Sequence, residues 1–535
     1  MSALRLRGDS LKTWAAVLSL LCLAGAGLLS SCASDRSGSA VALGLIADNP
    51  GAPVVQLNAG KLRGSGTQVL AFKGIPYAAP PLGDLRWRPP APAVTWGEGI
   101  RDATQFGPAC MQAAAIPKSE DCLFVNVWTP KEALTQRQKL PVMVWVFGGS
   151  FHSGSGNIDG TPLAQKGAVV VSMNYRVSTM GFMAHPELSR ESPNKVSGNY
   201  GILDVAQSLQ WVKANIEQFG GDPDRVTIWG VSSGASVITA LMSSPQSKGL
   251  FQRAILQSPG TFRHWKSLPE AEQQGLTVGP SLAALRALPV ERIKLLQNTG
   301  GGAEIRALSE PRVIGPVRDG VVLPHEERVT FEAGNMTRVQ VLVGNSTDEG
   351  SMFTGKYRLS TVPEFRKYLS EKKIFGAYGE EAGSIYPVSK DAEVQRAIAL
   401  SFGDSQFWFG TRGVARAAVA QGLTAYRYVF ARKQGGGAGA DAGHADEVKF
   451  VFGESVLKAA PYNEDDRRIS QAMMSAWLRF ASTGNPNGGV VNDWPAFEAG
   501  SEKAYVFDTK FTVVDAPRAT QLDFIGRFDA SIPSQ

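Results

Sequence analysis

The sequence predicts an α/β fold with a large, mostly parallel central sheet and helices on both faces. Two observations support this prediction. Segments 140–148 and 167–175 are continuous apolar runs rich in Val, which is typical of parallel strands buried on both faces. Strand-like and helical segments also alternate along most of the chain. Because no repeat or long linker interrupts this alternation, we expect a single domain at 50–535.

The middle of the chain gives the clearest succession of elements. Residues 204–219 carry apolar side chains at helical spacing and predict an amphipathic helix. Segment 225–230 (RVTIWG) predicts a strand, the following residues a tight turn, and segment 235–244 a helix. Further strands are predicted at 253–258, 338–345 and 424–432.

The composition excludes several classes of partner. Apolar residues make up 43% of the chain and charged residues 19%, with a net charge of +6 and no blocks of like charge. Without a basic run or alternating aromatic and basic residues, no nucleic-acid surface is expected. No two histidines lie at metal-ligand spacing, so neither a metal nor a cofactor is expected.

The N-terminal residues predict an exported protein. Residues 1–31 join a weakly basic start to an apolar stretch that is short for a membrane span, which is typical of a signal peptide. The sequence Leu-Ser-Ser-Cys ending at Cys32 resembles a bacterial lipobox, with an ordinary export signal as the alternative. Residues 32–49 predict a flexible tether. We expect a periplasmic or outer-membrane-anchored lipoprotein, or otherwise a secreted protein, that meets the membrane only through this anchor.

Two cysteines, Cys110 and Cys122, remain in the folded part of the chain. Export to an oxidising compartment predicts a disulfide between them. A pair of unlinked buried thiols is the alternative.

The segment 230–236 (GVSSGAS) places serines where a strand turns into a helix. A serine on such a turn takes a strained backbone conformation, and the residues two before and two after it must be small. Ser232 has Gly230 and Gly234 at these positions, whereas Ser233 has Val and Ala. We therefore predict that Ser232 is a nucleophile.

A serine hydroxyl needs a base to take its proton. With a nucleophile on a strand–turn–helix of this kind, the chain order is serine, acid, histidine. His444 follows the predicted strand 424–432 and is late enough to be the base. The other four histidines come too early: His152, His185, His264 and His325.

The acid is expected at the end of a strand between the serine and His444. Asp348 and Glu349 both follow the predicted strand 338–345, and spacing alone does not choose between them. Either carboxylate would orient His444 and stabilise its charged form.

A glycine loop follows the first apolar strand, at Gly148 and Gly149. The backbone amides of Gly149, Ser150 and Ser233 are predicted to converge on the negative charge that develops on a substrate oxygen. A simple glycine turn is the alternative.

These residues, in this order, make the chain resemble the type-B carboxylesterases, a family that includes cholinesterases and bacterial para-nitrobenzyl esterases. The resemblance extends from about residue 53 to 526 and includes FKGIPYAAPPLGDLRWRPP, SEDCLFVNVWTP, GLFQRAILQS, STDEGSMF, GHADEVKFVFG and AWLRFASTGNPN. It implies an α/β-hydrolase fold and favours Glu349 over Asp348 as the acid, with His444 as the base. It also supports the disulfide and implies a buried ion pair between Arg86 and Glu120.

The chain departs from the family pattern at several positions. Val231 replaces the usual Glu before the nucleophile, and Ser233 replaces the Ala after it. Phe147 opens the glycine loop and Ser150 replaces its last Gly, but the backbone amides are retained. Met352 stands where cholinesterases have an aromatic residue, and the segment between the two cysteines lacks tryptophan. A cationic choline ester is therefore not expected.

Together these features predict a serine carboxylic-ester hydrolase that acts through an acyl-enzyme on neutral, relatively apolar small-molecule esters. The alternatives are a catalytically weak binding or adhesion module of the same fold, and a hydrolase of lactone, amide or carbamate bonds.

Overall fold

The structure of the chain is a computed structural model. It describes residues 45–46, 51–296, 311–355, 358–371, 374–433, 441–453 and 462–532. The predicted signal peptide, Cys32 and most of the predicted tether lie outside these residues. The chain from Gly44 to Gln535 forms one compact unit.

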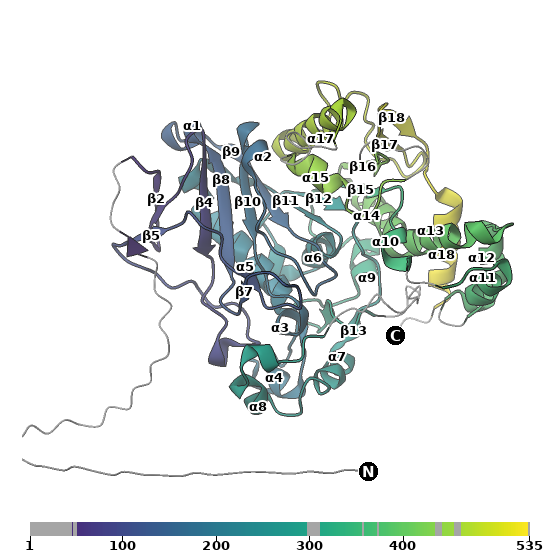
Figure 1. The fold of residues 1–535 in the computed structure, drawn as a ribbon, viewed down its shortest axis with the longest axis horizontal. Helices are drawn as coiled ribbons and strands as arrows, with labels where there is room; N and C mark the ends of the chain where they lie inside the picture. Colours follow the sequence, from purple (N-terminus) through teal and green to yellow (C-terminus); the bar gives the residue numbers. More distant parts are fainter. Residues whose placement is uncertain are drawn as a thin grey trace, which may run out of the picture. The chain divides into compact units, whose positions relative to one another are not determined.

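A sheet of ten strands lies at the centre of the described part of this unit (Figure 1). The strand order is β18 (Thr512–Val514), β17 (Ala504–Phe507), β16 (Ala425–Phe430), β15 (Gln340–Ser346), β12 (Arg253–Gln257), β11 (Gly221–Val231), β9 (Leu140–Val146), β10 (Val169–Met173), β8 (Phe124–Pro130) and β4 (Val69–Pro76). Strands β17 to β10 pair in parallel, and β18, β8 and β4 pair antiparallel at the two edges. The predicted large, mostly parallel sheet is confirmed.

The apolar runs of the sequence become strands β9 and β10, which lie between β11 and β8 in the sheet. Every residue of β10 is buried, and in β9 only Leu140 is partly exposed. Burial on both faces removes the alternation of polar and apolar residues that a half-exposed strand shows. The core of the unit therefore runs along the middle of the sheet.

Helices cover both faces, as successive residues of β11 show. A side chain at Gly230 would meet Ile238 of helix α6 (Ser233–Met242), so this face of the strand packs against α6. The preceding residue, Trp229, points the other way and contacts Phe452 of helix α15 (Glu447–Phe452), with ring centroids 5.0 Å apart. Helix α5 (Tyr200–Asn215) packs beside α6, and α17 (Glu464–Thr483) beside α15.

Further helices lie in the connections between strands. They are α1 (Lys131–Thr135), α2 (Thr161–Gln165), α3 (Ser178–Phe182), α4 (Pro186–Glu191), α7 (Leu268–Gly275), α8 (Leu282–Ala287), α9 (Glu327–Glu332), α10 (Ser351–Thr354) and α14 (Phe409–Ala420).

Near the C-terminal strands, four helices share a separate apolar cluster. These helices are α11 (Val362–Leu369), α12 (Gly379–Ile385), α13 (Val394–Gly403) and α18 (Ala519–Ala530), and they lie together in Figure 1. A π-helix, η7 (Asp404–Trp408), joins α13 to α14. Such π-turns insert a residue into a helix and frequently occur at functional sites.

A smaller sheet precedes the main one, in the order β1 (Leu45–Ile46), β5 (Ile100–Asp102), β3 (Gly60–Arg63) and β2 (Val54–Leu57). Strand β1 falls within the segment 32–49 that the sequence predicted as a tether, and its backbone pairs antiparallel with β5. Two-stranded pairs form between β6 (Ala109–Cys110) and β7 (Lys118–Ser119), and between β13 (Lys266–Ser267) and β14 (Val317–Arg318). Among the described residues, no helix has both the length and the apolar character needed to cross a membrane.

Candidate active site

Ser232 occupies a sharp turn between β11 and α6. Its backbone has φ 55° and ψ −126°, a conformation that is strained for a residue with a side chain. The crowding expected around such a turn is present, because a Cβ at Gly230 would lie 2.7 Å from the carbonyl oxygen of Val146, and one at Gly234 only 2.3 Å from it. The turn therefore requires glycine at the two positions that the sequence analysis used to select Ser232.

The two adjacent serines have different environments. Ser232 is partly exposed, whereas Ser233 is 2% exposed and its buried hydroxyl has no hydrogen-bond partner among the described residues. The amide of Ser232 donates to the carbonyl oxygen of Gln257 at the end of β12. Only Ser232 thus presents its hydroxyl at the carboxyl edge of the sheet.

The glycine loop after β9 lies against this turn. A Cβ at Gly148 would be 3.0 Å from the Cβ of Ser232 and 3.3 Å from a methyl group of Val231. Gly149 has φ 131°, and a Cβ there would come within 2.0 Å of the carbonyl oxygen of Ser153, so only glycine fits. Ser150 follows with φ 57°. Gly148 therefore lies against the turn of Ser232, and the predicted amide donors of Gly149 and Ser150 follow it directly in the chain.

The third predicted donor, the amide of Ser233, is the first of helix α6. The first amides of a helix have no intrahelical partner and carry the positive end of the helix dipole. This amide is thus suited to a developing oxyanion next to Ser232.

Glu349 is buried just beyond the end of β15. Its Oε1 accepts hydrogen bonds from the amide of Ser346 at 2.7 Å, the hydroxyl of Ser258 at 2.6 Å and the side-chain amide of Asn345 at 3.3 Å. Its Oε2 lies 2.5 Å from Nδ1 of His444. Three donors fix one oxygen, so the other is held toward the imidazole.

His444 is 5% exposed and has its two ring nitrogens in different environments. An ionised carboxylate only accepts hydrogen bonds, so Nδ1 carries the proton that faces Glu349. The other nitrogen, Nε2, is buried and has no hydrogen-bond partner within the described part of the chain. This tautomer leaves the lone pair of Nε2 able to accept a proton.

Asp348, the alternative acid, is turned away from His444. Its carboxylate accepts hydrogen bonds from the amides of Gly350 and Ser351 and pairs with Arg396. Of the two adjacent carboxylates, which spacing alone did not distinguish, Glu349 therefore faces His444 and Asp348 does not.

The remaining histidines lie in other environments. His185 caps helix α4 and contacts the carbonyl oxygen of Gly279, and His325 is exposed. Burial lowers the pKa of both His152 and His264, and nearby arginines lower it further: one beside His152 and two beside His264. No cluster of His, Cys, Asp or Glu suited to a metal ion occurs among the described residues.

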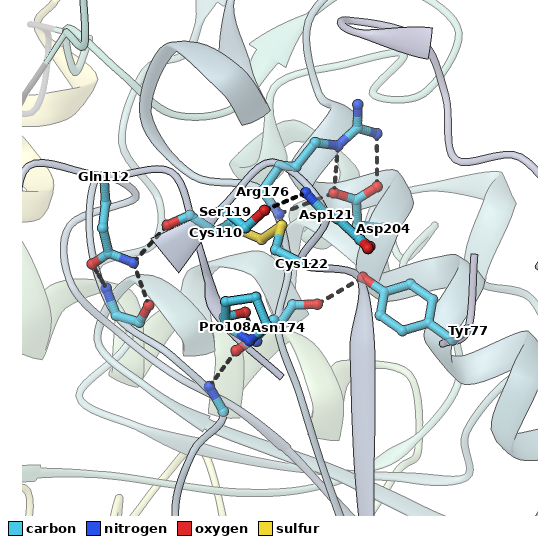
Figure 2. Close-up of a disulfide and its surroundings, with 12 residues drawn as sticks. Tyr77, Pro108, Cys110, Gln112, Ser119, Asp121, Cys122, Asn174, Arg176 and Asp204 are labelled. Carbon is cyan, nitrogen blue, oxygen red and sulfur yellow. Dashed lines mark hydrogen bonds and ion pairs between the residues drawn. A yellow bond between two sulfur atoms is a disulfide. The ribbon is translucent and has the colours of Figure 1, made fainter. Parts of the chain in front are cut away.

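Cys110 and Cys122 form a disulfide (Figure 2). The loop they close is tied to the chain just beyond the glycine loop, because the side chain of Gln112 donates to the carbonyl oxygen of Gly154 at 2.8 Å and accepts from its amide at 2.9 Å. Figure 2 also shows Asn174, whose side chain donates to the carbonyl oxygen of Pro108. The disulfide thus supports the backbone that shapes the glycine loop.

Arg86 and Glu120 form a largely buried ion pair. Nε and Nη2 of Arg86 each lie 2.6 Å from a carboxylate oxygen of Glu120. The third guanidinium nitrogen, Nη1, donates to the carbonyl oxygens of Leu285 and Leu288. The pair therefore links the residue after β7 to the end of helix α8 and the residue that follows this helix.

Several groups around His444 were not identified from the sequence. Phe353 and Phe407 pack on the imidazole, with ring centroids 5.1 Å and 4.4 Å away. Glu447 is fully buried and accepts hydrogen bonds from the hydroxyls of Ser346 and Tyr428. Burial, followed by the charge of Glu349, raises the pKa of Glu447 to about 7. Glu447 lies in the motif GHADEVKFVFG, but no spacing rule marked it as a neighbour of the acid.

Known proteins resemble this chain over most of its length. A profile of the Carboxylesterase family matches residues 51–525. The fumonisin B1 esterase of Sphingopyxis macrogoltabida is 42% identical over 465 residues, which cover 83% of this chain and 84% of that protein. The para-nitrobenzyl esterase of Bacillus subtilis (strain 168) is 33% identical over 504 residues, which cover 87% and 97%.

Solved structures agree with these sequence matches. A para-nitrobenzyl esterase structure superposes with a TM-score of 0.76 at 32% identity, covering 88% of this chain and 99% of the other. A carboxylesterase of Geobacillus stearothermophilus gives a TM-score of 0.74 at 32% identity with the same coverage.

Proposed function

The chain belongs to the carboxylesterase family and is an ester hydrolase of the α/β-hydrolase fold, and we propose that it acts through an acyl-enzyme formed on Ser232. His444 takes the hydroxyl proton through Nε2 while Ser232 attacks the ester carbonyl. His444 then delivers this proton to the leaving alcohol. Water, activated by the same histidine, releases the acid.

Glu349 and the backbone amides have supporting roles in this proposal. Glu349 holds His444 in the required tautomer and stabilises the imidazolium that forms during each proton transfer. The amides of Gly149, Ser150 and Ser233 stabilise the oxyanion, and each such donor contributes about 3 kcal/mol to lowering the barrier.

One observation carries the proposal. His444 is buried, its Nδ1 lies 2.5 Å from a carboxylate that three other donors fix, and its Nε2 has no partner among the described residues. A buried nitrogen left without a hydrogen bond is costly in a purely structural histidine. It is the arrangement that a base needs for an incoming proton.

The names of the relatives suggest substrates to test. One relative is a fumonisin B1 esterase and another a para-nitrobenzyl esterase, so fumonisin B1 and para-nitrobenzyl esters are the first candidates. Neither relative favours the alternative of a catalytically weak binding module. The preference for neutral, relatively apolar esters stays a prediction.

Presteady-state kinetics tests the function. With 4-nitrophenyl butyrate, the enzyme should release nitrophenol in a burst of about one equivalent whenever deacylation limits turnover, and Ser232→Ala should abolish turnover. Matched lactone, anilide and carbamate substrates define the bond that is cleaved best. Unchanged turnover by Ser232→Ala in a folded protein would refute the acyl-enzyme on this residue.

We also propose that the protein is exported and anchored to the outer membrane through lipidated Cys32. The lipobox-like sequence before Cys32 and the polar residues after it support this proposal. Expressed in a Gram-negative host, the full chain should sediment with membranes and Cys32→Ser should not. Identical fractionation and mass of the two proteins would instead indicate a plain export signal.

A further inference from the structure

A cavity of about 270 Å³ lies apart from the candidate active site. Helix α4, the loop after it, the start of helix α5 and the segment after β14 contribute to its lining, which includes Trp87, Leu188, Val196, Tyr200, Leu203 and Val322. Within the described part of the chain, this lining contains none of the residues Ser232, Glu349 and His444.

Helix α6 gives the separation between the two places. Gln246, which also lines the cavity, follows the C-terminal end of α6, whereas Ser232 precedes its N-terminal end. The helix has ten residues, so its two ends are about 15 Å apart. A molecule in this cavity therefore leaves the catalytic residues uncovered.

The apolar walls of the cavity are held in place by the surrounding structure. Trp87, Leu188 and Tyr200 belong to one buried apolar cluster. The indole N–H of Trp87 donates to the carbonyl oxygen of Thr179 at 3.1 Å, and the guanidinium of Arg176 lies over the ring of Tyr200, 5.3 Å from its centroid. The cavity thus presents a preformed apolar surface, as small-molecule sites usually do.

The charged side chains of the lining already have partners. Oδ1 of Asp319 accepts from the amides of residues 321, 322 and 323, and its Oδ2 accepts from the side chain of Asn199 at 3.0 Å. Glu191 pairs with Arg286 at 2.5 Å and with Arg88 at 3.5 Å. An ionic ligand would lose its water without gaining a counter-charge, which is costly. The cavity is therefore suited to a neutral ligand.

The size and the aromatic side chains of the cavity narrow the ligand further. A cavity of about 150 Å³ is large enough for benzene, so this one has room for a second fused ring. Trp87 and Tyr200 favour ring-shaped ligands through stacked or edge-to-face contacts. Burial raises the pKa of Tyr200, so its hydroxyl stays protonated and can donate to a ligand oxygen. Arg88 and Asn194 are exposed, which opens the cavity to solvent.

We infer that this cavity is a second small-molecule site, which binds a neutral aromatic alcohol independently of the catalytic site. This class of ligand includes alcohols that an ester hydrolase releases from its substrates. The inference goes beyond the proposed function and does not depend on which residue is acylated.

Calorimetric titration with 2-naphthalenemethanol tests the inference. The enzyme is first inactivated with a fluorophosphonate, so that the catalytic site is occupied. One equivalent of the alcohol should still bind, with a Kd of roughly 10 to 100 µM. Leu203→Trp places a larger side chain in the cavity and should weaken this binding at least about tenfold, while kcat for 4-nitrophenyl butyrate stays at the wild-type value.

Leu276→Trp is the matched control, because Leu276 is exposed and lies outside the described lining of the cavity. It should bind the alcohol as the wild type does. Two charged analogues of the probe, 2-naphthoate and 2-naphthylmethylammonium, should both bind at least about tenfold more weakly than the alcohol.

The possible failures are distinguishable. No binding to the inactivated enzyme, unchanged binding by folded Leu203→Trp, or a charged analogue that binds as well as the alcohol would overturn the inference. Should Leu203→Trp fail to fold, Val196→Trp in the loop after α4 takes its place, with the same expected loss. An enzyme that resists the fluorophosphonate contradicts the proposed acyl-enzyme instead, and the titrations of untreated wild type and Leu203→Trp then decide the inference.

Discussion

Replacing Glu349 by Gln should invert the tautomer of His444 while leaving its surroundings in place. Oε1 of Glu349 accepts from Ser258, Ser346 and Asn345, so only the carbonyl oxygen of the new amide can occupy that position. Its NH₂ group must then face Nδ1 of His444. A donor there makes Nδ1 the acceptor and places the ring proton on Nε2, which can no longer take the proton of Ser232.

The expected loss follows from this change. If all of His444 carries its proton on Nε2, kcat should fall by roughly 10³- to 10⁴-fold, and KM should change little. This corresponds to about 4 to 5.5 kcal/mol of transition-state stabilisation.

The assay is steady-state hydrolysis of 4-nitrophenyl butyrate, with thermal unfolding to show that Glu349→Gln remains folded. Asp348→Asn is the matched control, because Asp348 pairs with Arg396 instead of His444, and it should keep kcat within about threefold. A Glu349→Gln enzyme that retains more than a tenth of wild-type kcat, or an Asp348→Asn enzyme that loses as much, would refute this account of the acid.

Three further changes test the supports of the site. Replacing Cys110 and Cys122 together by Ala should lower the free energy of unfolding by about 3 kcal/mol, because the disulfide joins residues 12 apart and so restricts the unfolded chain. Urea denaturation measures this loss, and a loss below about 1 kcal/mol would contradict the prediction. Phe407→Leu removes a ring whose centroid lies 4.4 Å from that of the imidazole. Because His444 would then be less well oriented, kcat for 4-nitrophenyl butyrate should fall by about tenfold. An unchanged kcat would show that Phe407 does not orient His444. Glu447 has its pKa raised from 4.5 to about 7, so the stability it contributes is full below pH 4.5 and is lost as pH rises through about 7. Relative to Glu447→Gln, wild-type stability should therefore fall by up to about 3 kcal/mol over that interval, and parallel stability curves for the two proteins would contradict the shift.

The sheet and the nucleophile could be predicted because their signals are local. β9 and β10 can be assigned as buried strands without knowledge of the fold, because an unbroken run of apolar residues indicates burial on both faces. The glycines around Ser232 are equally local, because a Cβ at either position would collide with the neighbouring strand.

The surroundings of His444 could not be predicted in the same way. Phe407 reaches the imidazole from the π-helix η7, and an inserted helical residue has no recognisable pattern in a single sequence. Asp348 and Glu349 are adjacent, so only the backbone direction after β15 decides which one faces the base. The resemblance to a family resolved that choice, but spacing did not.

The central claim is that Ser232 carries the acyl group. The most direct test is to inactivate the enzyme with a fluorophosphonate and locate the adduct by peptide mass spectrometry. We predict one adduct per chain, on Ser232, with Ser233→Ala labelled at a similar rate because Ser233 contributes only its backbone amide. An adduct on Ser233, or labelling of Ser232→Ala at the wild-type rate, would contradict the assignment.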